Sequence, residues 1–339
     1  MNTKFYIEVK AEQRNHENER ICGDVFLSKK IKEENRIIVV LSDGLGHGVK
    51  ANMLATLTAT MALNFTVEHK DFRKIAEIIM NTLPECSERK INYSTFTIID
   101  IELDGQTHIL EYDNPPAFIL RNNKAFDPQW EEIVLESEKN AGKKLRLCSF
   151  TPHKEDRILI FSDGITQAGM GSKAYPFGWG HENASEYARQ IVKNTPDISA
   201  QKLANKIVTA AYKNDHYHAK DDTSCASLYF REPRKLLITT GPPYEDENDK
   251  KLAEKVQSFP GMKIICGATT ADIIARELNK EVEDSFEFND EDLPPVSYME
   301  GVDLVTEGIL TLSKVSKILN KYNKNHTLGK GTADQIVKM

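Results

Sequence analysis

The pattern of apolar and polar positions divides the chain into two regions with different periods. Up to about residue 231, apolar or alternating runs typical of strands follow one another, and helical stretches interrupt them at residues 51–65, 71–83 and 199–213. This order predicts a meander of antiparallel strands with flanking helices. From residue 232 onward, strand-like and helix-like segments alternate, which is typical of a small α/β domain. We therefore expect an α+β protein with domains at residues 1–231 and 232–339, separated near Pro233.

The second region is expected to contain three strands and three helices before a polar tail. The strands are expected at residues 235–240, 262–266 and 302–306, and the helices at residues 245–259, 269–279 and 309–322. The last residues, 323–339, are polar and are expected to be partly loose.

Composition and charge argue against several function classes. The net charge of −7, with no long stripe of Lys or Arg, disfavours a nucleic-acid partner bound through phosphate contacts. No run of roughly 18 apolar residues exists, and the N-terminus lacks an apolar core long enough for a signal peptide. We therefore expect a cytoplasmic protein without a membrane partner. The five cysteines are scattered and form no C-x-x-C pair, which indicates reduced thiols rather than a zinc site.

A strand that ends on an acid and three alternate glycines is the strongest chemical signal in the chain. Residues 37–40 form a β-branched run, and Asp43 follows it with Gly44, Gly46 and Gly48. Three interpretations are open: a tight turn between strand and helix, a dinucleotide-binding turn, and a metal site with Asp43 as a ligand. The glycine spacing is not G-x-G-x-x-G, and Asp43 would occupy the place of the pyrophosphate, so the second is disfavoured.

The Ser-Asp-Gly sequence recurs at the end of a second apolar strand, where Asp163 takes the place of Asp43. The adjacent pair Asp221 and Asp222 then precedes another apolar strand. Neighbouring carboxylates repel each other unless a cation or an arginine offsets their charge. A further acid, Asp24, also lies directly before a strand. Each acid alone is compatible with a solvated turn, but together they favour convergence on one cation site.

These motifs, in this order, resemble those of a known family. Gly-Asp at residues 23–24, Asp-Gly-x-Gly-x-Gly at 43–48, Ser-Asp-Gly at 162–164 and Asp-Asp at 221–222 are similar to the motifs of SpoIIE-type bacterial phosphatases of the metal-dependent PP2C class. The resemblance covers about residues 1–231. It implies an α/β/β/α sandwich, with two antiparallel sheets, helices outside them and a two-metal centre at one edge. The second region resembles the accessory domain fused to phosphatases of bacterial iron-only hydrogenase systems.

The resemblance also implies roles for individual residues. Asp43 would bridge two divalent cations, Mn²⁺ or Mg²⁺, and the Gly44 carbonyl would help to hold one of them. Asp163 and Asp221 would hold the first cation, and Asp24 would belong to the shell of the second. Asp43 and Asp163 are therefore the expected catalytic residues.

In the family that the chain resembles, an apolar residue and a Thr usually follow the two acids, but here Thr223 and Ser224 follow them. Because of this difference, Asp222 is an alternative ligand to Asp221. Several carboxylates share one site only when divalent cations neutralise them, and such cations lower the pKa of bound water toward neutrality. That hydroxide attacks the phosphomonoester, so no nucleophilic side chain is required.

The resemblance also implies a substrate, which is phosphoserine or phosphothreonine on a small protein partner. His47 and Lys50 are candidates for the rim of the site or for substrate contacts. His47 does not lie where animal-type enzymes of the class place a histidine, so the role of general acid does not transfer to it. One alternative is a catalytically weak or inactive signalling module of the same fold. A phosphoacceptor receiver is disfavoured, because there the acid pair closes the first strand, whereas Asp221-Asp222 comes last.

Two turns of the second region are candidates for a ligand or partner site. Gly241 follows the first expected strand, and Gly267 with Thr269 and Thr270 follows the second. Turns at the carboxyl ends of parallel strands often bind ligands, and a helix start presents N–H groups to an anion. A small anion, a nucleotide-like ligand or a docked partner is therefore expected there. The alternative is that both threonines only cap the helix.

Overall fold

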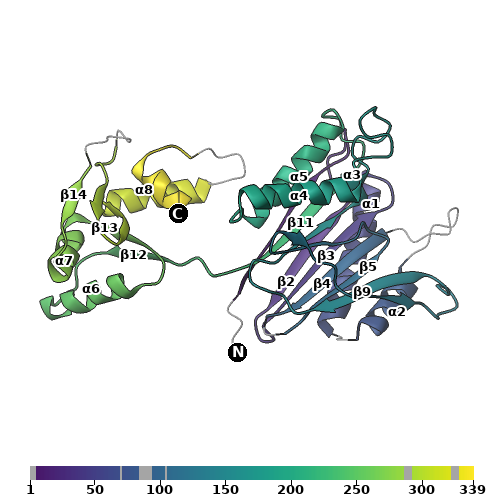
Figure 1. The fold of residues 1–339 in the computed structure, drawn as a ribbon, viewed down its shortest axis with the longest axis horizontal. Helices are drawn as coiled ribbons and strands as arrows, with labels where there is room; N and C mark the ends of the chain where they lie inside the picture. The colour runs from purple at the N-terminus through teal and green to yellow at the C-terminus, as the bar shows by residue number, and fades with distance from the viewer. Residues whose placement is uncertain (1–4, 69–70, 84–93, 104, 286–291, 322–327) are drawn as a thin grey trace. The chain divides into compact units, whose positions relative to one another are not determined.

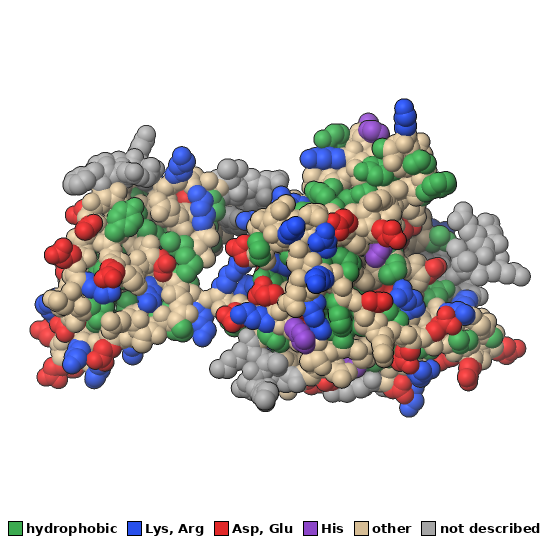
Figure 2. Space-filling model, viewed as in Figure 1, with side chains coloured by type: hydrophobic (Ala, Val, Ile, Leu, Met, Phe, Trp, Pro, Cys, Tyr) green, Lys and Arg blue, Asp and Glu red, His purple; other side chains and the backbone are tan. Residues whose placement is uncertain are grey.

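The computed structural model describes residues 5–68, 71–83, 94–103, 105–285, 292–321 and 328–339. The chain divides into two compact units, Met1–Pro233 and Arg234–Met339, and each is described by itself (Figure 1). Acidic and basic side chains lie close to one another on the face of each unit shown in Figure 2. This face therefore has no continuous acidic patch, and any chemistry of the acids depends on local sites.

Among its described residues, the first unit contains two sheets in which every strand pair is antiparallel. The five-stranded sheet has the order β1-β11-β10-β6-β7, with bounds Tyr6–Arg14, Thr223–Arg231, Arg157–Phe161, Phe118–Arg121 and Lys124–Ala125. The six-stranded sheet has the order β2-β3-β4-β5-β9-β8, with bounds Val25–Ile31, Arg36–Gly44, Ser94–Glu102, Thr107–Tyr112, Lys144–Phe150 and Trp130–Val134.

Three apolar layers hold the sheets and helices together. The central layer lies between the sheets and includes Val39 and Ile99 from one sheet and Ile160 and Leu228 from the other. A second layer joins the six-stranded sheet to helices α1 (Gly48–Glu68) and α2 (Phe72–Thr82). The third joins the five-stranded sheet to α3 (Asp163–Thr166), α4 (His181–Asn194) and α5 (Ala200–Asn214). The expected α/β/β/α sandwich is confirmed (Figure 1).

Local sequence explains where several elements begin. The side chain of Asp71 caps α2 by accepting hydrogen bonds from the backbone N–H groups of Arg73 and Lys74. Helix α1 begins at Gly48, directly after the glycine-rich turn, rather than at residue 51 as expected. Helix α4 was not predicted. It has no side-chain cap to mark its start, and its buried residues Ala184, Ser185 and Ala188 are small.

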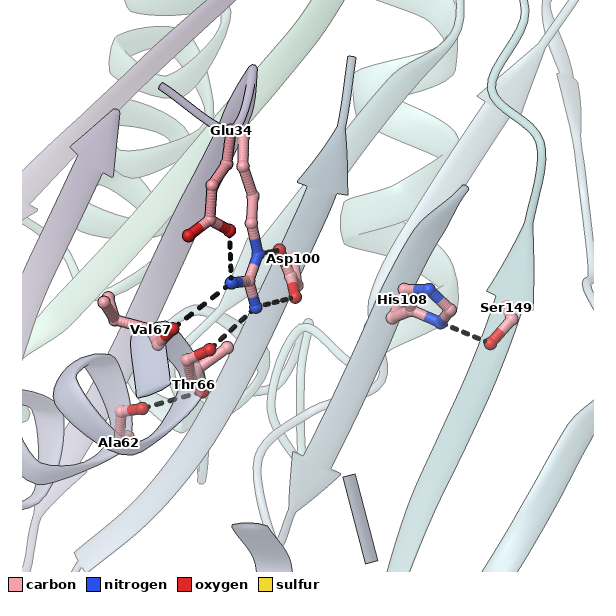
Figure 3. A network of polar contacts seen from close by, with 8 residues as sticks. Glu34, Ala62, Thr66, Val67, Asp100, His108 and Ser149 are labelled. Carbon is pink, nitrogen blue, oxygen red and sulfur yellow. Dashed lines mark hydrogen bonds and ion pairs between the residues drawn. The ribbon is translucent and has the colours of Figure 1, made fainter. Parts of the chain in front are cut away.

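A buried ion pair ties the C-terminal end of α1 to the six-stranded sheet (Figure 3). Arg36 is 1% exposed, and its Nε and Nη2 atoms donate to the two carboxylate oxygens of Asp100 at 2.7 and 2.6 Å. Its Nη2 also donates to the Thr66 carbonyl at 2.7 Å, and its Nη1 donates to the Val67 carbonyl at 3.4 Å. These carbonyls belong to the last turns of α1, where a helix leaves acceptors unpaired and favours a cation. Arg36 therefore positions the helix that begins at the glycine-rich turn.

The second unit is a mixed sheet with helices on it. Its strand order is β12-β13-β16-β15-β14, with bounds Leu236–Thr240, Met262–Cys266, Val302–Thr306, Ser297–Met299 and Val282–Asp284. The three strands that the alternating pattern predicts are present, and β15 and β14 were not predicted. The first three strands are parallel, and β15 and β14 add antiparallel pairs. The main helices are α6 (Asp249–Ser258), α7 (Ala268–Leu278), α8 (Ile309–Lys321) and α9 (Thr332–Lys338). Helix α9 lies in the tail expected to be partly loose, and it is ordered because Ala333 and Ile336 pack into the core.

Glu111 on β5 gives the first unit a pH-dependent stability. Its carboxylate is 3% exposed, Oε1 accepts a 2.6 Å hydrogen bond from the Ala117 N–H, and burial raises its pKa from 4.5 to about 7. The folded state thus binds the proton more tightly than the unfolded state. The stability from this group is fully present below pH 4.5 and is lost as the pH rises from 4.5 through about 7.

We expect Glu111→Gln to remove this loss, which is roughly 3–4 kcal/mol over the whole shift at about 1.4 kcal/mol per pKa unit. The measurement is urea unfolding of both proteins in EDTA between pH 5 and pH 8, with Glu132→Gln as a matched control on an exposed acid of β8. A constant difference between wild type and Glu111→Gln across this range would refute the assignment.

Candidate metal centre

Three of the predicted acids line one cavity of about 400 Å³ in the first unit. Asp43 lies near the end of β3, Asp163 is the first residue of α3 just after β10, and Asp221 lies in the turn before β11. Gly44 lines the same cavity. The two Ser-Asp-Gly strand ends and the Asp-Asp turn therefore meet, although they come from different sheets.

The other two predicted acids are buried and are absent from the described lining of the cavity. Asp24 and Asp222 are each 2% exposed. Asp222 accepts a 2.9 Å hydrogen bond from the backbone N–H of His16, and Asp24 accepts a 2.6 Å hydrogen bond from the Ser224 hydroxyl. The remaining oxygen of each carboxylate, Oδ1 of Asp24 and Oδ2 of Asp222, has no hydrogen-bond partner among the described residues. Buried, unpaired carboxylate oxygens fit a cation site.

The pKa values of the acids also indicate a cation site. Burial raises the pKa of Asp43 well above its usual range, and the charges of Asp24 and Asp163 raise it further. Burial also raises the pKa of Asp24 to about 7 and, with the charge of Asp163 as the next cause, that of Asp221 to about 6. Acids this close together cannot all ionise unless a proton or a cation offsets their charge. A bound divalent cation would lower their pKa values instead of raising them. The donor set therefore fits Mn²⁺ or Mg²⁺, which prefer oxygen ligands.

Two glycines of the repeated motif allow the backbone to approach the site closely. A Cβ atom on Gly44 would lie 2.1 Å from the Ala51 carbonyl oxygen at the start of α1. A Cβ atom on Gly164 would lie 2.2 Å from the Asp222 carbonyl oxygen. Only glycine fits at either position, which explains why each acid is followed by one.

Two serines orient the buried carboxylate of Asp24, and sequence reasoning missed their role. Ser162 Oγ accepts a 2.8 Å hydrogen bond from the Ser224 N–H, and Ser224 Oγ donates to Asp24. Gln13 Nε2 donates to Ser224 Oγ at 3.0 Å. Ser224 was noted only as a departure from the usual residues after the acid pair. Its partner Asp24 lies 200 positions away in the sequence, so no local signal reveals the contact.

We expect Ser224→Ala to weaken metal binding by roughly 10- to 100-fold, the usual effect of removing a group that orients a ligand. The fold should be retained, because the change removes one hydroxyl from a small side chain. Mn²⁺ titration followed by calorimetry measures the affinity, and Ser227→Ala on the same strand is the control, since the Ser227 hydroxyl has no hydrogen-bond partner among the described residues. Equal affinities for the two variants would contradict this role of Ser224.

Of the two predicted rim residues, only His47 is among the described residues that line the cavity. Its Nδ1 lies at hydrogen-bond distance, 2.8 Å, from Oε1 of Glu19, and its ring stacks on His16 with centroids 4.2 Å apart. Lys50 is exposed on the first turn of α1 and is not among the described lining residues. Lys220, which sequence reasoning did not single out, does line the cavity.

Asp113 is a further acid that sequence reasoning missed, because the sequence Asp113-Asn114-Pro115-Pro116 is typical of an ordinary turn. It lines the cavity, has a left-handed backbone with φ of 58°, and its pKa is raised by burial and by Asp163. The neighbouring Asn114 side chain donates to the Leu41 carbonyl at 3.4 Å, which fixes this turn against β3.

The candidate residues of the second unit do not all meet. Gly267 lines a cavity there, whereas Gly241, Thr269 and Thr270 are not among the described residues that line it. Thr270 is buried in the first turn of α7 at 1% exposure.

The acids of the first unit share a cavity without forming a complete cage. Among the described residues, no group of three or more Asp, Glu, His or Cys side chains has the arrangement that holding a metal ion requires. The case for a metal centre therefore rests on the shared cavity, the unpaired oxygens and the mutual effect of the acids on their pKa values.

Two facing antiparallel sheets with helices outside them, and acids gathered where strands of both sheets end, define the architecture of the PP2C-type phosphatases. The sequence model of the family described as Stage II sporulation protein E (SpoIIE) matches residues 33–231, more than half of the chain. The chain belongs to this SpoIIE family. The match ends before the second unit, so the resemblance of that unit to a hydrogenase-associated accessory domain stays a prediction. None of the curated proteins compared with the chain matches it.

Solved structures share the sandwich. The phosphatase domain of the cell fate determinant SpoIIE from Bacillus subtilis is 15% identical, with a TM-score of 0.52 over 71% of this chain and 99% of that one. A longer Bacillus subtilis SpoIIE structure, with the PP2C domain and a fragment of the regulatory domain, is also 15% identical, with a TM-score of 0.55 over 68% and 65%. At this identity the likeness shows the fold alone. In the part of the chain that the structure describes, no helix combines the length and apolarity that crossing a bilayer requires.

Proposed function

We propose that this protein is a metal-dependent phosphatase that hydrolyses phosphoserine or phosphothreonine on a protein substrate. The observation that carries the proposal is the meeting of Asp43, Asp163 and Asp221 in one cavity, with Asp24 and Asp222 buried among the same interacting acids. Acids that raise one another's pKa are costly to stability, and such clusters mark functional sites. The rival interpretation is a catalytically weak or inactive module of the same fold.

The residues of the proposed centre have two kinds of role, as metal ligands and as groups that orient the phosphate. Asp43, Asp163, Asp221 and the Gly44 carbonyl would hold the two cations together with Asp24, while Asp222 fixes the backbone of His16. When bound, the cations supply a water of lowered pKa and offset the charge of the phosphoryl oxygens. Lys220 and the stacked His16 and His47 bring hydrogen-bond donors to the same cavity, where they would orient the phosphate.

Hydrolysis of p-nitrophenyl phosphate tests the proposal directly. We expect turnover with Mn²⁺ that stops when EDTA removes the metal and returns when Mn²⁺ is added in excess. Metal binding by calorimetry without turnover would instead favour the inactive module. Turnover that persists in EDTA would exclude the metal centre altogether.

We expect phosphoserine and phosphothreonine peptides to be hydrolysed faster than matched phosphotyrosine peptides. Phosphotyrosine-type enzymes attack with a cysteine thiolate, but burial raises the pKa of Cys22, Cys148, Cys225 and Cys266, so none of these described cysteines offers a thiolate. Phosphate release from the three peptides at equal concentration is the measurement. A higher rate on phosphotyrosine would refute the assigned substrate class.

We also propose that residues 232–339 form a separate accessory domain that binds a ligand or partner and takes no part in the chemistry. All the acids of the proposed centre lie before residue 223, and the chain divides between Pro233 and Arg234.

A further inference from the structure

The second unit contains a cavity of about 830 Å³ that the proposed phosphatase chemistry does not use. It lies at the carboxyl ends of β13 and β16, because Gly267 and Ala268 follow β13, and Glu307 and Gly308 follow β16. The two strands are parallel neighbours, and the Gly267 N–H donates to the Thr306 carbonyl at 2.7 Å. Small-molecule sites in proteins typically measure about 300–1,000 Å³, so this cavity has the size of a ligand site.

The chain leaves β13 and β16 toward opposite faces of the sheet. Ile265 on β13 packs in one cluster with Ile274 of α7. Its neighbour Ile264 packs in another cluster with Val315 of α8. Successive residues of a strand face opposite sides, so α7 and α8 cover opposite faces.

Adjacent parallel strands whose connections part in this way form a crevice between them, and ligands of open α/β sheets bind in such crevices. The topology and the cavity therefore favour the space between β13 and β16 over the Gly241 turn after β12.

The charge of the walls decides what the crevice binds. Its described lining includes the carboxylates of Asp272, Asp284 and Glu307, and it includes no Lys, Arg or His. The Asp272 carboxylate has no hydrogen bond or ion pair with another described residue, and the Asp284 carboxylate accepts a 2.7 Å hydrogen bond from the Ser297 hydroxyl. Carboxylates without basic partners attract a cation and repel a phosphate.

Glu307 also occupies the groups that an anion would need. Its Oε2 accepts hydrogen bonds from the N–H groups of Leu310 at 3.1 Å and Thr311 at 3.3 Å, in the first turn of α8. A phosphate at this helix start would have to displace a carboxylate. The small anion or nucleotide-like ligand expected from the sequence is therefore disfavoured here.

We propose that the crevice between β13 and β16 binds a small organic cation, an amine or guanidinium group carried on an apolar body. The carboxylates of Asp272 and Asp284 would pair with the charge, and Val282, Val305 and Pro295 would contact the apolar part. The site is independent of the metal centre, so its test does not depend on phosphatase activity.

Three probes that share one apolar body separate charge from shape: benzylamine, benzyl alcohol and benzoate. Calorimetry on the full chain in metal-free buffer is expected to give an affinity for benzylamine at least roughly tenfold higher than for either of the others. Binding of benzoate as tight as that of benzylamine, or no binding of benzylamine, would overturn the proposal.

Variants then locate the binding. Asp272→Asn and Asp284→Asn are each expected to weaken benzylamine binding by roughly three- to tenfold, because each removes one charge near the ligand. Glu283→Gln is the matched control, since Glu283 is adjacent to Asp284 on β14 but is not among the described lining residues. Circular dichroism checks that each variant is folded. One folded variant, Asp272→Asn or Asp284→Asn, is enough to test whether benzylamine binds in the crevice. Unchanged affinity in a folded Asp272 or Asp284 variant would place the ligand elsewhere.

Discussion

Asp43→Asn is expected to reduce Mn²⁺-dependent hydrolysis of p-nitrophenyl phosphate by roughly a thousandfold or more. Metal cations supply several kcal/mol of transition-state stabilisation, and each 1.4 kcal/mol or so corresponds to a factor of ten. Asp43 is the acid whose pKa is affected by Asp24, Asp163 and Asp221 together, so its charge is central to the site. Asp163→Asn should have a similar effect, because Asp163 lines the same cavity.

The fold should survive this change. Asparagine keeps the shape of Asp43 and removes a charge that burial and neighbouring acids disfavour, so the metal-free variant should melt at the same temperature as wild type or higher. Exposed Glu132→Gln serves as the control and should change neither property. Near wild-type turnover of Asp43→Asn at limiting Mn²⁺ would show that the assigned centre is wrong.

Asp100→Asn is expected to destabilise the first unit by about 3–5 kcal/mol, the usual cost of removing one charge from a buried ion pair. Of its ion pairs with described residues, Arg36 would keep only the 3.3 Å pair with Glu34, whose side chain is 43% exposed. Arg36 and Asp100 are 1% and 2% exposed, so water cannot replace the lost charge (Figure 3). Urea unfolding monitored by circular dichroism measures the difference. Glu131→Gln, which breaks the exposed pair with Arg73, should cost less than about 1 kcal/mol.

A double replacement separates the charge from the packing. Arg36→Met combined with Asp100→Leu removes both charges and keeps apolar volume, so most of the lost stability should return. If Asp100→Asn proves no more costly than Glu131→Gln, the pair does not carry the stability assigned to it.

Much of the fold and the positions of the acids could be predicted because their signals are local. A β-branched run that ends on Asp43, and its repetition at Asp163, identify strands and their ends without any knowledge of long-range contacts. The cap at Asp71 is likewise a local signal. These features need only a few neighbouring residues.

The remaining features depend on contacts between distant segments. Ser224 orients Asp24 across 200 positions, and the Asp113 turn enters the cavity only because the two sheets pack face to face. In the second unit, the sequence predicts one ligand site from Gly241, Gly267, Thr269 and Thr270. Gly267 lines a cavity there, whereas the other three are not among its described lining residues. The cavity lies where α7 and α8 leave neighbouring strands on opposite faces. Strand order of this kind cannot be read from periodicity.

The acids of the proposed centre come from both sheets: Asp24 and Asp43 flank or end strands of one, and Asp163 and Asp221 flank strands of the other. Cations held by all four would therefore act as a clamp that opposes separation of the sheets. Such a clamp stabilises the assembled sandwich by mass action, by about 2.7 kcal/mol when the free cation is at a hundred times its dissociation constant. The sandwich would then be more rigid where metal is plentiful, and slow amide exchange in the layer between the sheets would report metal supply.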